Sequence, residues 1–179
     1  MSDYLADTYQ DAYKIGERAL KRGEGLQVDI DAGVTTLWGP DLERFMDELA
    51  PGEPFGIVAV VPMPEAPEDE PECAWTITRD HLEDADQTGS KWTSGPSNIS
   101  ERQSAMLTAG APLVDGYERH VFRMYDDDGI LYYTGRAVFP AEAQAFSDEP
   151  LVAPLYQFGA PDAGATLITW QGHPDWECC

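Results

Sequence analysis

The sequence is poor in basic residues. Eleven Lys and Arg stand against 33 Asp and Glu, which gives a net charge of −22 over 179 residues. Such a charge repels phosphate groups, so it argues against direct binding of nucleic acid or of an anionic membrane. The same charge attracts basic proteins. A generally solvated, salt-adapted surface is the alternative interpretation of the acidity.

Long apolar runs, export signals and patterned cysteines are lacking as well. The longest apolar run, Phe55 to Val61, is far too short to span a bilayer. The first seven residues contain neither the basic nor the apolar segment of a signal peptide. Cys73, Cys178 and Cys179 do not show metal-ligand spacing, and free thiols are typical of a reducing compartment. We therefore expect a cytoplasmic protein that does not bind a membrane.

Motifs for catalysis or cofactor binding are also missing. The sequence has no G-x-S-x-G elbow, no P-loop, no dinucleotide fingerprint and no HExxH pattern. Asp84 to Ser90 matches the first half of a calcium loop, but Gly95 occupies the twelfth position, where a bidentate Glu is required. The triplet from Asp126 to Asp128 is acidic enough for a metal, yet turn chemistry explains it. We predict no catalytic residue, no metal site and no cofactor.

The clearest structural prediction from the sequence is a β-hairpin over His120 to Phe139. Two runs rich in aromatic and β-branched residues flank Asp126 to Gly129, and an Asp-Gly pair supplies the positive φ angles of a tight turn. The apolar spacing predicts another hairpin over residues 26–38 and a further strand over residues 75–78.

Other segments complete the expected fold. Helices are predicted over residues 3–22, from Pro40 to about residue 50, and over 100–109 behind a Ser100/Gln103 capping box. Further predictions are a buried central strand at 55–61, an acidic Pro-rich surface loop at 62–72, strands at 151–158 and 165–170, and a polar tail at 171–179. The chain should form a single compact α+β domain, 1–179, with a largely antiparallel sheet, hairpins and about three short helices.

Part of the sequence resembles a known group of proteins. The segments from Phe122 to Gly135 and from Pro154 to Trp170, and more weakly Trp75 to Leu82, resemble small uncharacterised acidic proteins of actinobacteria and their phages. The resemblance covers about a third of the chain, over residues 120–170. It implies a bacterial or phage setting and a hairpin-plus-strand module. It implies no activity, because none is assigned to that group.

The concentration of acidic residues suggests a function. Nine acidic residues and one basic residue, Arg79, lie between Glu65 and Asp86. We expect a non-enzymatic binding protein that engages a basic protein surface, such as a phage-encoded inhibitor or DNA mimic of a host nucleic-acid enzyme. The candidate binding residues are Glu65, Glu68, Asp69, Glu70, Glu72, Glu83, Asp84 and Asp86.

Two other functions are compatible with the sequence. A small metal-dependent hydrolase would use dispersed side chains such as Asp80, His81 and His120, although these histidines and His173 are far apart in the chain. A phage structural or assembly protein would oligomerise through an exposed apolar patch. The sequence leaves the oligomeric state open.

Overall fold

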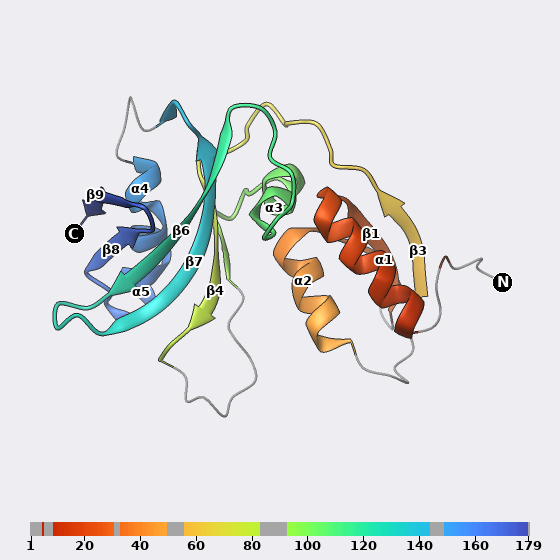
Figure 1. The fold of residues 1–179 in the computed structure, drawn as a ribbon, viewed down its shortest axis with the longest axis horizontal. Helices are drawn as coiled ribbons and strands as arrows, with labels where there is room; N and C mark the ends of the chain where they lie inside the picture. Colours follow the sequence, from red (N-terminus) through yellow and green to blue (C-terminus); the bar gives the residue numbers. More distant parts are fainter. Residues whose placement is uncertain are drawn as a thin grey trace. The chain divides into compact units, whose positions relative to one another are not determined.

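The computed structural model describes Leu5 and residues 9–30, 33–49, 56–82, 93–143 and 149–178 (Figure 1). The fold is α+β with antiparallel sheets, as the sequence predicts. The single domain expected from the sequence consists of two compact units. The first comprises Met1–Pro67 and Ser100–Pro112, and the second comprises Glu68–Ile99 and Leu113–Cys179. Among the described residues, no helix is long and apolar enough to cross a membrane.

In its described residues, the first unit has a three-stranded sheet in the order β2-β1-β3 and three helices. Its elements are α1 (Tyr9–Arg22), β1 (Gly25–Ile30), β2 (Gly33–Leu37), α2 (Gly39–Glu48), β3 (Gly56–Val61) and α3 (Glu101–Leu107). The hairpin expected over residues 26–38 is confirmed by the antiparallel pairing of β1 with β2. The three predicted helices are also confirmed, but the first is shorter than the predicted 3–22. Leu5 lies in a bend, and its N–H donates to the Ile57 oxygen of β3 at 2.6 Å.

The position predicted for the strand at residues 55–61 is wrong. Among the described strands β3 pairs with β1 alone, so β3 is an edge strand and β1 lies at the centre. Ile57 is fully buried, whereas Val60 is 39% exposed. A continuous apolar run shows strand propensity, but the number of neighbouring strands depends on pairings that lie elsewhere in the chain.

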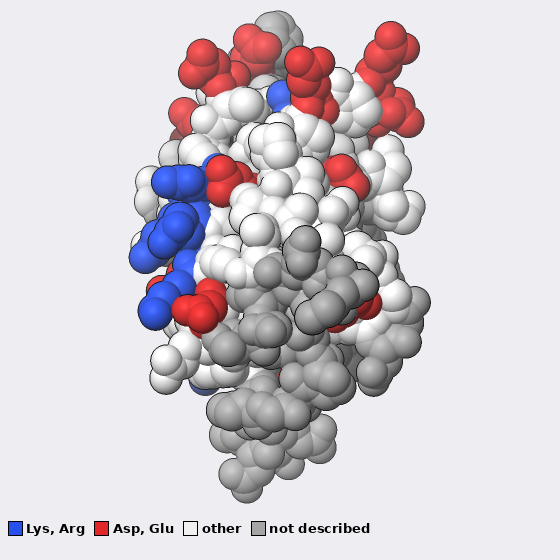
Figure 2. Space-filling model, turned by 90° about the vertical axis from the view of Figure 1, so that its right-hand side faces the viewer, with Lys and Arg blue, Asp and Glu red and all other residues white. Residues whose placement is uncertain are grey.

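Small residues allow the helices of the first unit to pack closely. Ala12, Gly16 and Ala19 form the buried side of α1, and a Cβ on Gly16 would lie 2.1 Å from Met46 Sδ. The exposed side of α1 is basic, and Figure 2 shows basic side chains gathered along one edge of the face that it draws. The exposed basic residues of α1 are Lys14, Arg18, Lys21 and Arg22.

The start of α3 is fixed by its predicted capping box. Ser100 Oγ accepts a hydrogen bond from the Gln103 N–H at 3.0 Å, and the Ser100 N–H donates to Gln103 Oε1 at 3.4 Å. The two bonds satisfy N–H groups that a helix start otherwise leaves without partners. Gln103 is fully buried, so this cap also belongs to the interior of the unit.

The described part of the second unit forms an antiparallel sheet of six strands in the order β5-β4-β7-β6-β8-β9. Its strands are β4 (Ala74–Asp80), β5 (Ser94–Gly95), β6 (Tyr117–Tyr125), β7 (Leu131–Pro140), β8 (Leu167–Trp170) and β9 (His173–Cys178). The central pair, β6 and β7, confirms the hairpin predicted over His120 to Phe139. Gly129 at its turn has a φ of 78°, which explains the Asp-Gly pair.

Two predictions for the C-terminal third are wrong. Residues 151–158 were expected as a strand but are helical, in α4 (Glu149–Pro154), the π-helical turn η2 (Leu155–Gly159) and α5 (Ala160–Ala163). Buried Leu151, Ala153 and Leu155 face the core from these turns, and so short an apolar run suits a helix as well as a strand. The expected polar tail at 171–179 contains β9, which covers the edge of β8.

Aromatic side chains fill the core of the second unit, and a glycine makes room for them. Phe122 is fully buried on β6 and lies across Gly135 on β7. A Cβ on Gly135 would lie 2.1 Å from Phe122 Cζ and 2.5 Å from the backbone oxygen of Thr76. Tyr133 is also buried, and its hydroxyl donates to Asp162 Oδ2 at 2.5 Å, which ties α5 to the sheet.

The close contacts at Gly135 predict that its substitution strongly destabilises the fold. We expect Gly135→Ala to lower the free energy of unfolding by about 3 kcal/mol, because the added methyl group meets both a packed ring and backbone. Gly116→Ala is the control. It has open space around its Cβ position but a φ of 86°, so it should lose only about 1–2 kcal/mol. Urea unfolding followed by tryptophan fluorescence measures both changes, and equal losses would contradict the packing argument.

Candidate functional site

The predicted acidic surface is described in part. Residues 62–72 form a loop, as expected, in which Glu65, Glu68, Asp69 and Glu72 are exposed. Glu70 is half-buried, and its Oε2 accepts a hydrogen bond from the Tyr117 hydroxyl at 3.0 Å. The loop crosses the boundary between the units, since Glu65 belongs to the first unit and the other four belong to the second. The remaining candidates, Glu83, Asp84 and Asp86, lie outside the described residues, as does most of the calcium-like segment.

The acidic charge is greater in the second unit. Its sequence contains 19 acidic and five basic residues, a net charge of −14, whereas the first unit contains 14 and six, a net charge of −8. The basic side of α1 accounts for four of the six basic residues in the first unit. The second unit therefore carries the stronger negative field.

A pocket of about 330 Å³ adjoins the acidic loop. Pro71 and Glu72 come from the end of the loop, while Glu149 and Pro150 come from the start of α4. The other lining residues are Cys73, Pro96, Ala153 and Gln157. Among the described residues that line it, the two charged side chains are both glutamates, and both are exposed. Glu149 was not among the predicted binding residues, because the strand predicted at 151–158 gave no reason to place it beside Glu72.

Cys73 at the base of this pocket is a structural residue. Its side chain is buried, and its thiol donates to the backbone oxygen of Pro150 at 3.6 Å. Burial raises the pKa of the Cys73 thiol to about 12, because the charged thiolate would lose its hydration. The thiolate is the nucleophilic form of cysteine, so Cys73 is unreactive at neutral pH.

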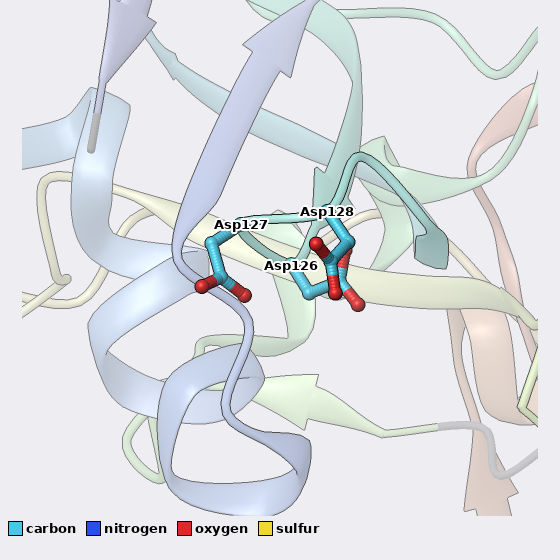
Figure 3. A group of neighbouring side chains, drawn as sticks. All are labelled: Asp126, Asp127 and Asp128. Atoms are coloured by element: carbon cyan, nitrogen blue, oxygen red, sulfur yellow. The ribbon is translucent and has the colours of Figure 1, made fainter.

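The Asp126–Asp128 triplet is part of a hairpin turn. One oxygen atom from each carboxylate lies within 4.8 Å of the others, and Figure 3 draws the Asp127 carboxylate apart from those of Asp126 and Asp128. Asp126 Oδ1 accepts from the Ile130 N–H at 2.7 Å, and the Asp126 N–H donates to the Ile130 oxygen at 3.2 Å. The first aspartate therefore serves the turn, as predicted, and the other two are exposed.

The grouping of Asp80 and His81 with His120 is wrong. Asp80 pairs with Tyr133 and His120 with Ala137, so the two positions are separated by four residues along β7, about 13 Å. His81 Nε2 lies 2.9 Å from the Thr134 hydroxyl, with which it forms a hydrogen bond. The depression that His120 lines includes neither Asp80 nor His81, so the predicted grouping of these three side chains loses its support.

His120 instead lies beside His173, which sequence separation had hidden. The β8–β9 turn is held against β6 by a hydrogen bond from the Gln171 N–H to the Val121 oxygen, at 2.9 Å. The imidazole centroids of His120 and His173 are 5.2 Å apart, with the rings at 74°. Both residues line an open depression of about 550 Å³, together with Leu113, Glu118, Arg119, Val121, Gln171 and Gly172.

The surroundings of His120 are mainly aromatic. Its ring stacks on Phe139 with centroids 4.8 Å apart and meets Trp176 edge-on at 5.0 Å. Burial lowers the pKa of His120 below its ordinary 6.5, and this effect outweighs the opposing influence of the Glu118 carboxylate. The imidazole is therefore neutral at pH 7. The pKa of His81 is also lowered, first by burial and then by Arg79.

Comparison of the chain with protein-family models, with curated proteins and with solved structures finds no match in any of the three.

The burial of His120 predicts a pH dependence. In an NMR titration, the imidazole of His120 should have its midpoint below 6.5. The unfolded chain then binds a proton that the folded chain does not, so the free energy of unfolding should fall as the pH drops below about 6.5. A midpoint for His120 at or above 6.5 would contradict the burial argument.

The position of Cys73 predicts selective protection. With iodoacetamide at pH 8, the native chain should leave Cys73 unmodified, because its thiol is buried and has a pKa of about 12. In denaturant Cys73 should react fully. Mass spectrometry of tryptic peptides distinguishes the three cysteines from the native and unfolded samples, and rapid native labelling of Cys73 would refute its burial.

Proposed function

We propose that the protein is a non-enzymatic binding protein that engages a basic segment of another protein through the acidic surface of its second unit. The observation that carries the proposal is the pocket beside the acidic loop, whose charged lining residues are Glu72 and Glu149. Exposed Glu68 and Asp69 extend the same negative charge along the loop that leads to the pocket.

The pocket has the chemistry that a Lys or Arg side chain requires. Such side chains have an apolar stem and a charged end, and they bury the stem along apolar surface. Pro71, Pro96, Pro150 and Ala153 supply apolar walls, and the two glutamates supply charge for the cationic end. Gln157 is already engaged, because its Oε1 accepts from Trp75 Nε1 at 2.8 Å.

Long-range electrostatics support the same partner. A net charge of −14 on the second unit would accelerate its encounter with a basic surface and repel nucleic acid and anionic membranes. Nucleic-acid enzymes present basic surfaces of this kind. An inhibitor or DNA mimic of such an enzyme, in a bacterial cytoplasm, is therefore the finer form of the proposal.

A charge-matched pair of variants tests the proposal. One variant carries Glu68→Gln, Asp69→Asn and Glu72→Gln in the acidic loop. The control carries Glu17→Gln, Asp47→Asn and Glu48→Gln, three exposed carboxylates of the first unit. Each variant loses three negative charges, so any difference between them reports position and not net charge. We expect the loop variant to capture at least about tenfold less of a basic partner from bacterial lysate, which corresponds to about 1.4 kcal/mol.

The comparison is made at about 0.15 M salt, where exposed charges more than about 8 Å apart are largely screened. The wild-type chain and the control should retain the same protein, identified by mass spectrometry, and duplex DNA should displace it if its nucleic-acid site is occupied. Equal losses in both variants would show that binding follows general acidity, and no retained protein at this salt would overturn the proposal.

A further inference from the structure

The depression at the β8–β9 turn brings together two imidazoles and a carboxylate. Glu118 and His120 alternate with Arg119 on β6, so they project on the same face of the strand. His173 is the first residue of β9 and reaches them because β8 pairs with both β6 and β9. All three residues line the depression.

One ring nitrogen of His120, Nε2, is buried and makes no well-formed hydrogen bond among the described residues. The residue is 8% exposed, and among the described residues no group hydrogen-bonds to its Nε2. Glu118 Oε2 lies 3.4 Å from this nitrogen, but the contact does not have the geometry of a hydrogen bond. A buried polar atom without a partner is costly, so native structures usually supply one. His120 itself lines the open depression, so a movement of its ring would bring this nitrogen to a ligand there.

Two pairwise distances around His120 match those between ligands of one metal ion. Two donor atoms at about 2.0–2.2 Å from a tetrahedral zinc ion lie about 3.4 Å apart, which is the separation of His120 Nε2 from Glu118 Oε2. Two imidazoles on such an ion have ring centres about 5 Å apart, and those of His120 and His173 are 5.2 Å apart.

Neighbouring groups are suited to complete the site. The His173 ring stacks on Trp176 with centroids 3.6 Å apart and planes at 9°, which restrains its orientation. Glu118 has a side chain that is 54% exposed, so its carboxylate is free to turn toward an ion. Movement is needed to complete the set, because among the described residues only the Asp126–Asp128 triplet has three ligand atoms within 4.8 Å of one another. Since Glu118 and His120 already lie 3.4 Å apart, a ring nitrogen of His173 has to approach them.

We propose that Glu118, His120 and His173 bind a divalent transition-metal ion of the zinc class, with the fourth position open to the depression. Imidazole nitrogen and carboxylate oxygen are ligands that zinc accepts, and three protein ligands with one open position are typical of accessible zinc sites. The site is separate from the acidic loop and its pocket, with which it shares no lining residue.

Cobalt provides the test, because Co²⁺ in a four-coordinate site has strong visible absorption. The metal-free, full-length chain is titrated with Co²⁺ alone and then with Zn²⁺. We expect visible absorption that saturates at one equivalent of Co²⁺ and disappears when Zn²⁺ displaces it. Glu118→Gln and His173→Gln should each weaken Co²⁺ binding at least about tenfold, since even the loss of an outer contact to a ligand costs 10–100-fold.

Two controls locate the ion. His81→Gln removes the third histidine of the chain, and the double variant Cys178→Ser and Cys179→Ser removes the adjacent thiols. Both should bind Co²⁺ as the wild-type chain does, and circular dichroism verifies that every variant is folded. The proposal is overturned by an absence of visible absorption, by equal loss in His81→Gln, by loss in the serine variant, or by a loss that follows Asp127→Asn and Asp128→Asn instead.

Discussion

The pairing of β6 with β7 is the interaction on which the second unit depends. It runs from Tyr117 opposite Pro140 to Tyr125 opposite Leu131, and β4 and β8 add to its two sides. Phe122 can lie across the pair only because residue 135 is glycine. The same hairpin positions His120 beside the β8–β9 turn. The candidate metal site therefore depends on the pairing that also holds the second unit together.

Charge and core are separated in this protein. Among the described residues no acidic side chain is buried, while the buried clusters of both units consist of apolar and aromatic residues. A high net charge opposes compaction, so a large apolar interior is needed to offset it. Because the acidic side chains contribute little to the core, their positions are available for recognition. Neutralising them should alter binding more than folding.

Local patterns predicted the local structure well. The Asp-Gly turn, the Ser100/Gln103 cap and the alternation in β1 each act within a few residues, and all three are confirmed. The failures concern tertiary context, since pairing partners decided that residues 55–61 lie at an edge and packing decided that 151–158 is helical. The acidic loop was found from composition alone. Glu149 and the His120–His173 pair were not, because only the folded sheet and helices bring them together.

We infer that negative charge acts on a basic partner through one place on the second unit. Hydrogen–deuterium exchange of the full chain, with and without an arginine-rich peptide at about 0.15 M salt, tests this inference. Exchange should slow at residues 68–76 and 149–158, around the pocket of Glu72 and Glu149, and stay unchanged in the first unit. Slowing spread evenly over both units, or confined to the first, would contradict the account.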